Sequence, residues 1–574
     1  MPRPAIRGCL RFSVALAATA APTQAQHAAV EARHGLVASA HALASQAGVE
    51  ILRKGGNAVD AAVATGMALD VVYPVAGNLG GGGFMLIHLA DGRNTVIDYR
   101  ETAPASAVRD MYLGHDGKPI QGLSTCGWNA SGVPGTVAGF AMAVERYGSH
   151  KVSWSDLCEP ARRLAAEGFP VSAGTAEGLR SAEASLGRFS ESRRIYLARG
   201  SYHRAGETWV QEDLGRTFAR LQKNGPREFY EGETARRIAE AMAANGGNIT
   251  LADLKGYRPV ERAPLVGAYR GYAIATVPPP SSGGVALLQM LGMLEPLDVG
   301  SLGRDSTAKY HLFAEVMKRA FRDRAEYLGD PDFVEVPVQR LLDPSYLRGR
   351  MADFDPGRAT PAEAVRPGLG RYVAAARHES AETTHFSVAD AAGNAVSNTY
   401  TLNGAFGSCV TIPGTGILMN NQMDDFTSAI GAPNLFGLIQ GEANAIAPGK
   451  RPLSSMTPTF VFRDGGLILV TGSPGGPTII NTVLQVITNV IDFHMAVQDA
   501  VDAPRINEQW MPDVIGCEGH GLPPDTAAGL RAEGYTLDET GRQGDAESIG
   551  LDPRNQLILG ASDPRNSGAK AVGY

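Results

Sequence analysis

The chain has 574 residues and a mass of 60.4 kDa, which is more than a single hydrophobic core usually spans. With 44% hydrophobic and 19% charged residues, it has enough apolar surface for packed cores, which excludes general disorder. A net charge of -7 provides no basic field for a phosphate backbone, so we expect no nucleic-acid partner and favour a small-molecule ligand.

Residues 1–25 have the pattern of a secretory signal peptide. Three arginines precede an apolar run over 12–21, and the segment ends in small residues at 22–25. Because this run is too short to span a membrane, we expect cleavage, a periplasmic or secreted protein and no integral membrane segment. Loss of the three arginines takes the net charge from -7 to about -10.

Four cysteines follow the expected signal peptide: Cys126, Cys158, Cys409 and Cys517. They contain no CxxC pair, and their wide spacing does not resemble a disulfide framework or a zinc site. The sequence leaves open whether one pair forms a disulfide. We expect no metal and no cofactor, because the few histidines show no ligand spacing either.

The N-terminal part is predicted to begin with a helical hairpin. Apolar residues follow helical spacing over 41–53, and Asn57 is a suitable cap for a second helix to about residue 70. A glycine loop over 77–83 then leads into an apolar strand over 84–89. Because no strand precedes this loop and no Lys-Ser/Thr follows it, we interpret it as close backbone packing and not as a phosphate cradle.

The middle of the chain is predicted to be rich in helices, mainly over 130–270. Prolines and glycines over 278–284 cannot be regular structure and open a further helix over 285–294. A charged helix follows over 309–327. Residues 355–382 are rich in Pro, Gly, Ala and charge without clear periodicity, which is typical of an exposed linker.

Beyond this linker the sequence predicts a β-hairpin that begins at Thr383. Two β-rich runs, 383–390 and 395–403, flank a Gly-Asn turn. Antiparallel pairing about this turn sets the first residue of the hairpin opposite residues near its end. We therefore expect Thr401 and Asn403 to lie beside Thr383.

The position of Thr383 after a linker suggests a nucleophile. Cleavage between Glu382 and Thr383 would place a hydroxyl and a free amine on one residue. The amine, with a pKa near 7.7, can act as the base that the weakly nucleophilic hydroxyl needs. On pattern alone, an ordinary strand threonine remains the alternative.

Nine short blocks along the chain carry a more specific signal. They are GGNAVDAA at 55–62, GNLGGGGF at 77–84, DYRE at 98–101, PPPSSGG at 278–284, YLGDP at 327–331, TTH at 383–385, NNQMDDF at 420–426, RPLSSM at 451–456 and TGSPGG at 471–476. In this order they resemble the γ-glutamyltranspeptidase family of N-terminal-nucleophile hydrolases. The resemblance covers essentially the whole mature chain.

The resemblance implies an α+β fold, a four-layer αββα sandwich with two stacked, mostly antiparallel sheets. It also implies self-cleavage at Glu382–Thr383 into a large fragment, 26–382, and a small fragment, 383–574. Because both fragments would build one core, we expect them to stay together as a heterodimer. Periodicity alone indicates only a mixture of helices and strands.

A γ-glutamyl group carries an α-carboxylate and an α-ammonium, so its pocket needs a cation and an anion. By the resemblance, Arg100 binds the carboxylate, and a guanidinium suits this bidentate task. By the same resemblance, Asp425 binds the ammonium. The residues expected to assist are Ser454 and Ser455 for the carboxylate, and Asn403 and Gln422 for the ammonium.

The resemblance also implies the reaction. Thr383 attacks the γ-carbonyl of glutathione or a related amide, cysteinylglycine leaves, and water, an amino acid or a dipeptide takes the γ-glutamyl group. Thr401 orients the nucleophile. The N–H groups of Gly475 and Gly476, just before an expected helix start at Pro477, bind the oxyanion.

One residue departs from the family pattern. The segment 427–450 resembles the family's lid over the pocket, but it has Phe436 where a tyrosine is expected. A phenylalanine keeps the apolar cover and lacks the hydroxyl that could bond Asn403. We therefore expect an intact but looser gate.

Two rival functions stay open at this point. A glutaryl-cephalosporin acylase of the same family binds a group without an α-ammonium, so the anion at Asp425 favours the γ-glutamyl reading. A periplasmic amino-acid-binding protein could keep Arg100 and Asp425 but would have no need of Thr383. Cleavage of the chain discriminates between this binding protein and an enzyme.

Overall fold

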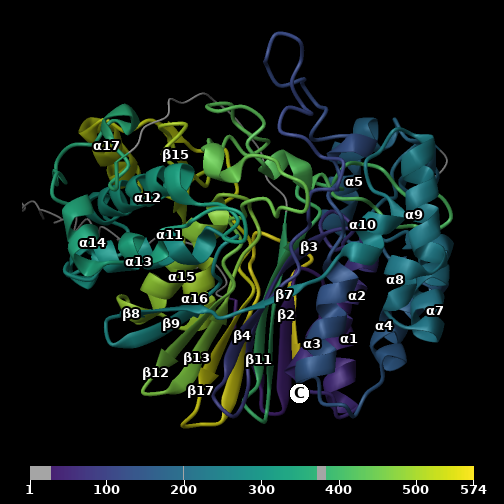
Figure 1. The fold of residues 1–574 in the computed structure, drawn as a ribbon. Helices are drawn as coiled ribbons and strands as arrows, with labels where there is room; N and C mark the ends of the chain where they lie inside the picture. The colour runs from purple at the N-terminus through teal and green to yellow at the C-terminus, as the bar shows by residue number, and fades with distance from the viewer. Residues whose placement is uncertain (1–26, 198–199, 371–382) are drawn as a thin grey trace, which may run out of the picture.

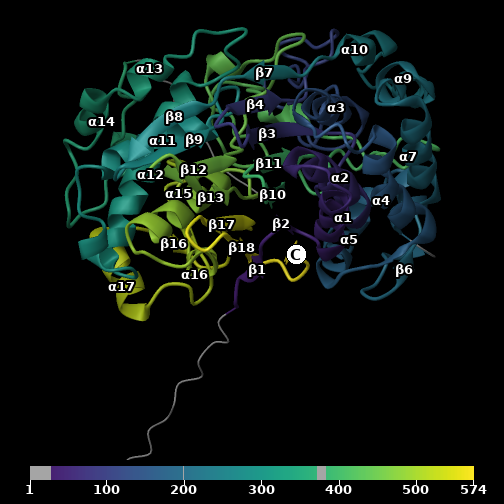
Figure 2. The ribbon, with the colours of Figure 1, turned by 90° about the horizontal axis from the view of Figure 1, so that it is seen from below.

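Two stacked β-sheets form the centre of the molecule, and helices cover the outer face of each (Figures 1 and 2). The computed structural model describes residues 27–197, 200–370 and 383–574, so the expected signal peptide and Glu382 lie outside the described residues. The four layers are those of an αββα sandwich, which confirms the expected fold class.

Both seven-stranded sheets are antiparallel throughout. The first sheet contains, in spatial order, β19 (Lys570–Gly573), β2 (Gly35–Ser39), β10 (Thr384–Asp390), β11 (Ala395–Thr401), β3 (Gly82–His88), β4 (Asn94–Asp98) and β7 (Val260–Arg262). The second contains β1 (Val30–Ala32), β18 (Leu557–Ala561), β17 (Ser548–Asp552), β13 (Gly466–Thr471), β12 (Thr459–Arg463), β9 (Tyr272–Thr276) and β8 (Leu265–Tyr269). Each sheet mixes strands from before residue 371 and after residue 382, so the two parts of the chain share one structure.

Each sheet has its own helical layer. The first is covered by α1 (Ala42–Arg53), α2 (Ala58–Val72), α3 (Thr136–Tyr147), α4 (Trp154–Glu167), α5 (Ala173–Leu186), α6 (Ser190–Tyr196), α7 (Glu212–Asn224), α8 (Arg227–Glu231), α9 (Glu233–Ala244) and α10 (Leu251–Gly256). The second is covered by α11 (Gly283–Leu294), α12 (Thr307–Tyr327), α13 (Val338–Leu341), α14 (Pro344–Arg350), α15 (Thr478–Ile491), α16 (Val497–Asp502) and α17 (Pro524–Glu533). Short strands pair outside the main sheets: β5 (Phe169–Pro170) pairs with β6 (Thr208–Trp209), and β15 (Ile515–Cys517) lies between β14 (Ile506–Asn507) and β16 (Leu537–Asp538) and pairs with both.

The first predicted elements are confirmed. Helices α1 and α2 form the expected hairpin, and Asn57 caps α2 in a capping box with Asp60. Every residue of α2 is buried, because the helix lies between β10, β11 and the outer helices. The glycine loop that follows is a close backbone approach, as interpreted: a Cβ on Gly81 would come within 2.0 Å of the carbonyl oxygen of Thr401.

The expected linker is only partly exposed. Its residues 371–382 lie outside the described residues, and most of 355–370 is exposed. Ala362 and Val365 are buried, however, and the Ala362 carbonyl accepts a hydrogen bond from the Trp510 indole at 2.9 Å. Two apolar side chains in a polar segment were too weak a pattern to predict this anchor.

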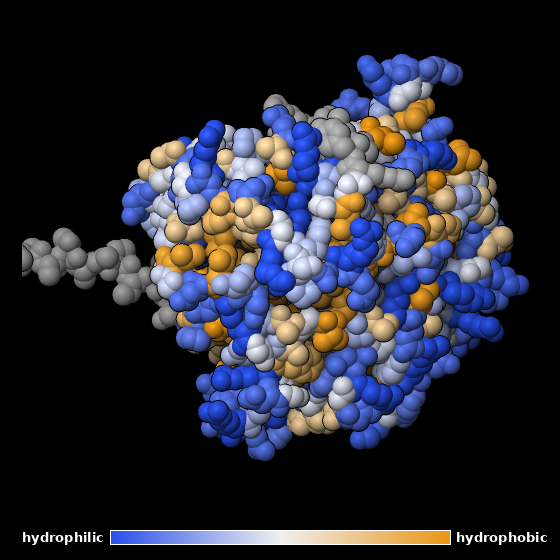
Figure 3. Space-filling model, turned by 60° about the vertical axis from the view of Figure 1, so that its left-hand side comes forward, coloured by the Kyte–Doolittle hydropathy of each residue, from blue (hydrophilic) through white to orange (hydrophobic). Residues whose placement is uncertain are grey.

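Hydrophobic residues on the face shown in Figure 3 are scattered among hydrophilic ones. A search of the described residues finds no helix that is both long and apolar enough to cross a membrane.

Candidate active site

Thr383 stands at the head of β10, in the middle of the first sheet. Strands β10 and β11 pair Thr384 with Tyr400, and the same register continued by one residue sets Thr383 opposite Thr401. The Asn403 backbone N–H donates to Thr401 Oγ1 at 2.7 Å. The hairpin therefore brings together the three residues that its turn predicted.

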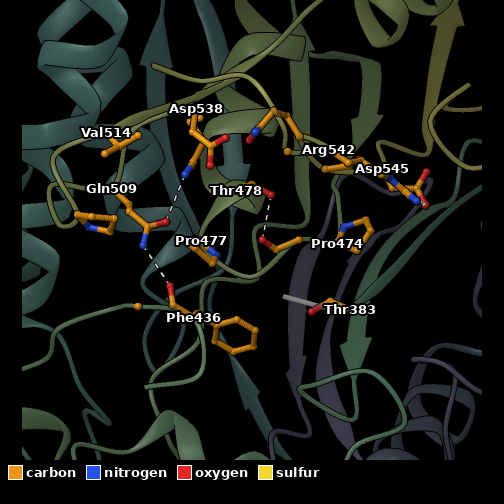
Figure 4. Close-up of a pocket in the computed structure, with 18 of the residues that line it drawn as sticks. Thr383, Phe436, Pro474, Pro477, Thr478, Gln509, Val514, Asp538, Arg542 and Asp545 are labelled. Atoms are coloured by element: carbon orange, nitrogen blue, oxygen red, sulfur yellow. Dashed lines mark hydrogen bonds and ion pairs between the residues drawn. The ribbon is translucent and has the colours of Figure 1, made fainter. Parts of the chain in front are cut away.

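Two cavities meet at Thr383 and Phe436. The smaller has a volume of about 20 Å³ and is also lined by Arg100, Arg324, Thr401, Asn403, Asp425, Ser454, Ser455 and Gly476. The larger has a volume of about 350 Å³ and includes Gly475, Gln509, Arg542 and Asp545 (Figure 4). Most of the predicted site residues thus surround one small cavity at the nucleophile.

The expected cation and anion of the pocket form an ion pair with each other. Arg100 Nη2 donates to Asp425 Oδ2, and both groups are buried. Arg100 also donates to the carbonyl of Leu453 at 3.3 Å, and Gln422 Nε2 donates to Asp425 Oδ2 at 2.6 Å. Burial raises the pKa of Asp425, and Arg100 opposes this rise. The charges predicted for two ends of a ligand therefore neutralise one another.

The predicted serines are held by the loop over 278–284. The Ser454 carbonyl accepts hydrogen bonds from the backbone N–H of Ser282 at 2.8 Å and from its hydroxyl at 2.6 Å. Ser455 Oγ accepts from Arg324 Nη2 at 3.2 Å. This gives the proline-rich loop a function that the sequence did not predict, which is to position the serine pair.

Sequence reasoning missed Arg324. This residue of α12 is buried, and its Nε donates to Ser282 Oγ at 2.8 Å, while its Nη1 has no hydrogen-bond partner among the described residues. Burial lowers the pKa of Arg324 to about 10, and Asp425 counteracts this shift. Its position shortly before the YLGDP block was the available signal.

Glu101 was also missed, although it belongs to the DYRE block. Its carboxylate is buried, makes no hydrogen bond within the described part of the chain, and lies 3.6 Å from Arg100 Nη1. Burial raises its pKa to about 7, against the favourable effect of Arg100. A second carboxyl group with a raised pKa therefore lies beside Arg100, although it lines neither of the two cavities.

Gly475 and Gly476 form a turn that only glycine adopts easily, with φ of 127° and 55°. Helix α15 begins directly after Pro477, close to the predicted start. Neither glycine N–H has an acceptor among the described residues. Two free donors beside Thr383, at the positive end of a helix, could stabilise an oxyanion, and this role stays a prediction.

Phe436 is buried and lines both cavities, as a lid residue would. Its carbonyl accepts from Gln509 Nε2 at 3.1 Å (Figure 4). The neighbouring Asn434 donates to Asp425 Oδ1 at 3.2 Å, so the segment is tied to the pocket. Asn403 Nδ2 donates to the Asn421 carbonyl at 3.1 Å. The looser gate stays a prediction.

His385 is a packed strand residue. It is fully buried, its Nδ1 lies 2.8 Å from Thr399 Oγ1, and burial lowers its pKa to about 3. Within the described ranges, no group of three or more His, Cys, Asp or Glu residues is placed to hold a metal ion.

A threonine that begins a central strand of an αββα sandwich, next to a glycine turn with free N–H groups, is the arrangement of an N-terminal-nucleophile hydrolase. A family model described as gamma-glutamyltranspeptidase matches residues 44–573. The chain belongs to the γ-glutamyltranspeptidase family, as its sequence blocks indicated.

Individual relatives agree with this assignment. The glutathione hydrolase proenzyme of Escherichia coli strain K12 is 47% identical over 532 residues, which cover 92% of this chain and 90% of the relative. A cephalosporin acylase from Bacillus halodurans superposes with a TM-score of 0.84 at 27% identity and covers 98% of this chain and 99% of its own. A γ-glutamyltranspeptidase structure from Helicobacter pylori has a TM-score of 0.57 at 40% identity, and it covers 61% of this chain and 98% of its own.

Proposed function

We propose that this protein transfers and hydrolyses γ-glutamyl groups, with glutathione or a related γ-glutamyl amide as acyl donor. The observation that carries the proposal is the Arg100–Asp425 ion pair in the same small cavity as Thr383. A γ-glutamyl group brings one negative and one positive charge. When this group binds, the Arg100–Asp425 ion pair can be replaced by two ion pairs, one between Arg100 and the α-carboxylate and one between Asp425 and the α-ammonium. No buried charge is then left uncompensated.

Each step uses a residue of the cavity. Arg100 and the two serines bind the α-carboxylate, and Asp425, helped by Asn403 and Gln422, binds the α-ammonium. The α-amine of Thr383 takes the proton of the Thr383 hydroxyl, and the hydroxyl oxygen attacks the γ-carbonyl. The α-amine then gives this proton to the leaving amine. Water or the amine of an acceptor then attacks the γ-glutamyl ester. The N–H groups of Gly475 and Gly476 bind the oxyanion in both steps.

Binding requires the small cavity to expand. A volume of about 20 Å³ holds about one water molecule, which is far less than a γ-glutamyl group. Arg100 and Asp425 therefore separate to admit the ligand, and the segment of Phe436 moves with them. The leaving peptide and the acceptor occupy the larger cavity of about 350 Å³, where Gln509 and Arg542 offer polar contacts.

The active form is proposed to be a heterodimer made by cleavage at Glu382–Thr383, after export and removal of residues 1–25. The mixed strand order supports it, because separated fragments would lose both sheets. The relative from Escherichia coli is named a proenzyme. The Helicobacter pylori chain covers 61% of this sequence, close to the share that residues 26–382 make up.

The main alternative is a glutaryl-cephalosporin acylase, since one superposed structure is a cephalosporin acylase. A glutaryl group would take Arg100 but offers no cation to Asp425. The carboxylate would then be buried without a charged partner, which costs several kcal/mol. The ion pair therefore favours a zwitterionic γ-glutamyl group.

Denaturing electrophoresis of the purified protein, with N-terminal sequencing, tests the proposal. We expect bands of about 38 and 20 kDa, the smaller one beginning Thr383-Thr384-His385. Thr383→Ala should stay uncut and hydrolyse a γ-glutamyl anilide at least about 10³-fold more slowly. Thr384→Val is the matched control, because Thr384 Oγ1 has no hydrogen-bond partner among the described residues. An uncut, inert wild-type chain would instead support the binding-protein reading.

A further inference from the structure

Two cysteines from opposite sides of residue 383 lie in contact. Gly127 donates its backbone N–H to the Ser408 carbonyl at 2.9 Å, which aligns the segments of Cys126 and Cys409. The two cysteines are therefore neighbours across these segments, and both residues are free thiols. Cys126 is half-buried and Cys409 is buried, so a reagent reaches the pair through Cys126.

The surroundings make the two sulfurs chemically different. Arg188 Nη1 donates to Cys126 Sγ at 3.2 Å. The interaction with Cys409 and the nearby Arg188 lower the pKa of Cys126 to about 6, whereas the interaction with Cys126 and burial raise the pKa of Cys409. By contrast, burial raises the pKa of Cys517 to about 11 and raises that of Cys158. The pair thus consists of an accessible nucleophile and a protonated neighbour.

We propose that Cys126 and Cys409 form a thiol–disulfide exchange site that joins the two fragments covalently. The joining of fragments rests on the cleavage proposed above, whereas the exchange itself does not. The co-reactant is a low-molecular-weight disulfide, a class of oxidant that persists in the oxidising compartments to which exported proteins go.

The exchange proceeds in two balanced steps. The Cys126 thiolate attacks one sulfur of the small disulfide, forms a mixed disulfide and releases one thiolate. That thiolate takes the proton of Cys409, whose sulfur then attacks Cys126 Sγ and releases the second thiolate. Overall, two protein thiols are oxidised to a disulfide, and one small disulfide is reduced to two thiols.

The bridge lies close to the acyl pocket. Ser124 Oγ, in the loop of Cys126, donates to Asp424 Oδ1 at 2.7 Å. Asn421 Nδ2 donates to the carbonyl of Thr125 at 2.8 Å. The loop that supplies the nucleophilic thiol is therefore hydrogen-bonded to the segment that carries Asp425.

The test uses the purified full-length protein and 2-hydroxyethyl disulfide, which carries no γ-glutamyl group. After alkylation of free thiols, a non-reducing denaturing gel should show one band of about 58 kDa that reduction splits into 38 and 20 kDa. Peptide mapping should find Cys126 linked to Cys409. Cys126→Ser and Cys409→Ser should each abolish the link, and the latter should retain the mixed disulfide at Cys126. Cys158→Ser is the control that keeps the link.

Peptide mapping of the wild-type protein separates this inference from the proposed cleavage. A linked peptide in an uncut chain would support the exchange site and contradict the cleavage. Cut fragments that separate without a reductant, and a map without the linked peptide, would overturn the exchange site and leave the cleavage intact. Neither result depends on whether a cysteine variant folds.

Discussion

Helix α12 carries three buried arginines, Arg319, Arg322 and Arg324, and the surroundings of the first and the last differ in one respect. Each guanidinium nitrogen of Arg319 has a partner: Nε donates to the Arg350 carbonyl at 2.8 Å, and Nη2 donates to Asp353 at 2.7 Å. Its Nη1 pairs with Glu315, and the other oxygen of that carboxylate accepts from the Thr360 N–H at 2.9 Å. The sequence shows only a charged helix and does not reveal that these charges lie inside the protein.

Arg324, further along the same helix, lines the small cavity and keeps one nitrogen without a hydrogen-bond partner among the described residues. Glu101 accepts no hydrogen bond from these residues either, although it lies 3.6 Å from Arg100. Buried polar groups are nearly always paired, so the unpaired nitrogen of Arg324, in a cavity with the nucleophile, points to a ligand. The comparison teaches that burial of charge does not distinguish structure from function here. An unpartnered nitrogen does so only together with its place in a cavity beside the nucleophile, because Arg505 and Glu547 also have unpartnered buried atoms among the described residues.

Among changes to the buried charges, the largest expected effect comes from removing the one that a zwitterionic ligand needs. Asp425→Asn should lower kcat/KM for a γ-glutamyl anilide about 100-fold, which corresponds to about 3 kcal/mol. The value for the corresponding glutaryl anilide should rise instead, because the substitution removes a buried carboxylate that glutaryl leaves without a charged partner. Steady-state kinetics with both anilides measures the ratio.

Asp424→Asn is the control for this experiment. The carboxylate of Asp424, next to Asp425 in the chain, is also buried, but it accepts hydrogen bonds from Ser124 and from the Leu435 N–H. If both asparagine variants lower the two activities equally, Asp425 does not recognise the ammonium group.

Arg319 and Arg324 of α12 provide the most direct test of the comparison. Arg319→Met leaves Glu315 and Asp353 without their cation and should lower stability by about 3 kcal/mol. Arg324→Met should lower stability by only about 1 kcal/mol, since it breaks hydrogen bonds to two hydroxyls and removes an incompletely paired charge.

Their kinetics should show the opposite order. Arg324→Met should raise KM for the γ-glutamyl anilide about 10-fold through Ser455, with a smaller change in kcat. Arg319→Met should retain the wild-type KM. Thermal unfolding measures the effect on stability, and steady-state kinetics measures the effect on KM. If both variants change Tm equally and KM equally, Arg319 and Arg324 do not differ in function.

The sequence predicted local elements well and the pocket only in part. The hairpin that places Thr401 opposite Thr383 follows from strand alternation and a Gly-Asn turn, both of which are local. The order of strands in the sheets depends on contacts between distant residues, for which one sequence gives no signal. The arginine and carboxylate of the pocket were expected to face a ligand, and the structure pairs them with each other.

Glu101, beside Arg100, should make both the stability of the protein and its KM depend on pH. Because its pKa is raised from 4.5 to about 7, the folded protein keeps a proton that the unfolded chain releases, so this group reduces stability as pH rises over that interval. Ionised Glu101 would also compete with the α-carboxylate for Arg100. We expect KM to rise several-fold between about pH 6 and 8 in the wild type and to stay flat in Glu101→Gln. A parallel rise in both proteins would assign the titration to another group.

The smallest expected effect concerns the lid. Phe436→Tyr adds a hydroxyl near Asn403, and one net hydrogen bond of about 1 kcal/mol would favour the closed gate roughly 5-fold. A more closed gate excludes water, so the ratio of transfer to hydrolysis should rise, measured with a γ-glutamyl anilide with and without a dipeptide acceptor. Phe462→Tyr, on strand β12, is a control for adding a hydroxyl elsewhere. If Phe436→Tyr leaves both the transfer rate and the hydrolysis rate unchanged, the prediction of a looser gate is wrong. The difference between the surroundings of Arg324 and Arg319 would then lie in the buried charges alone.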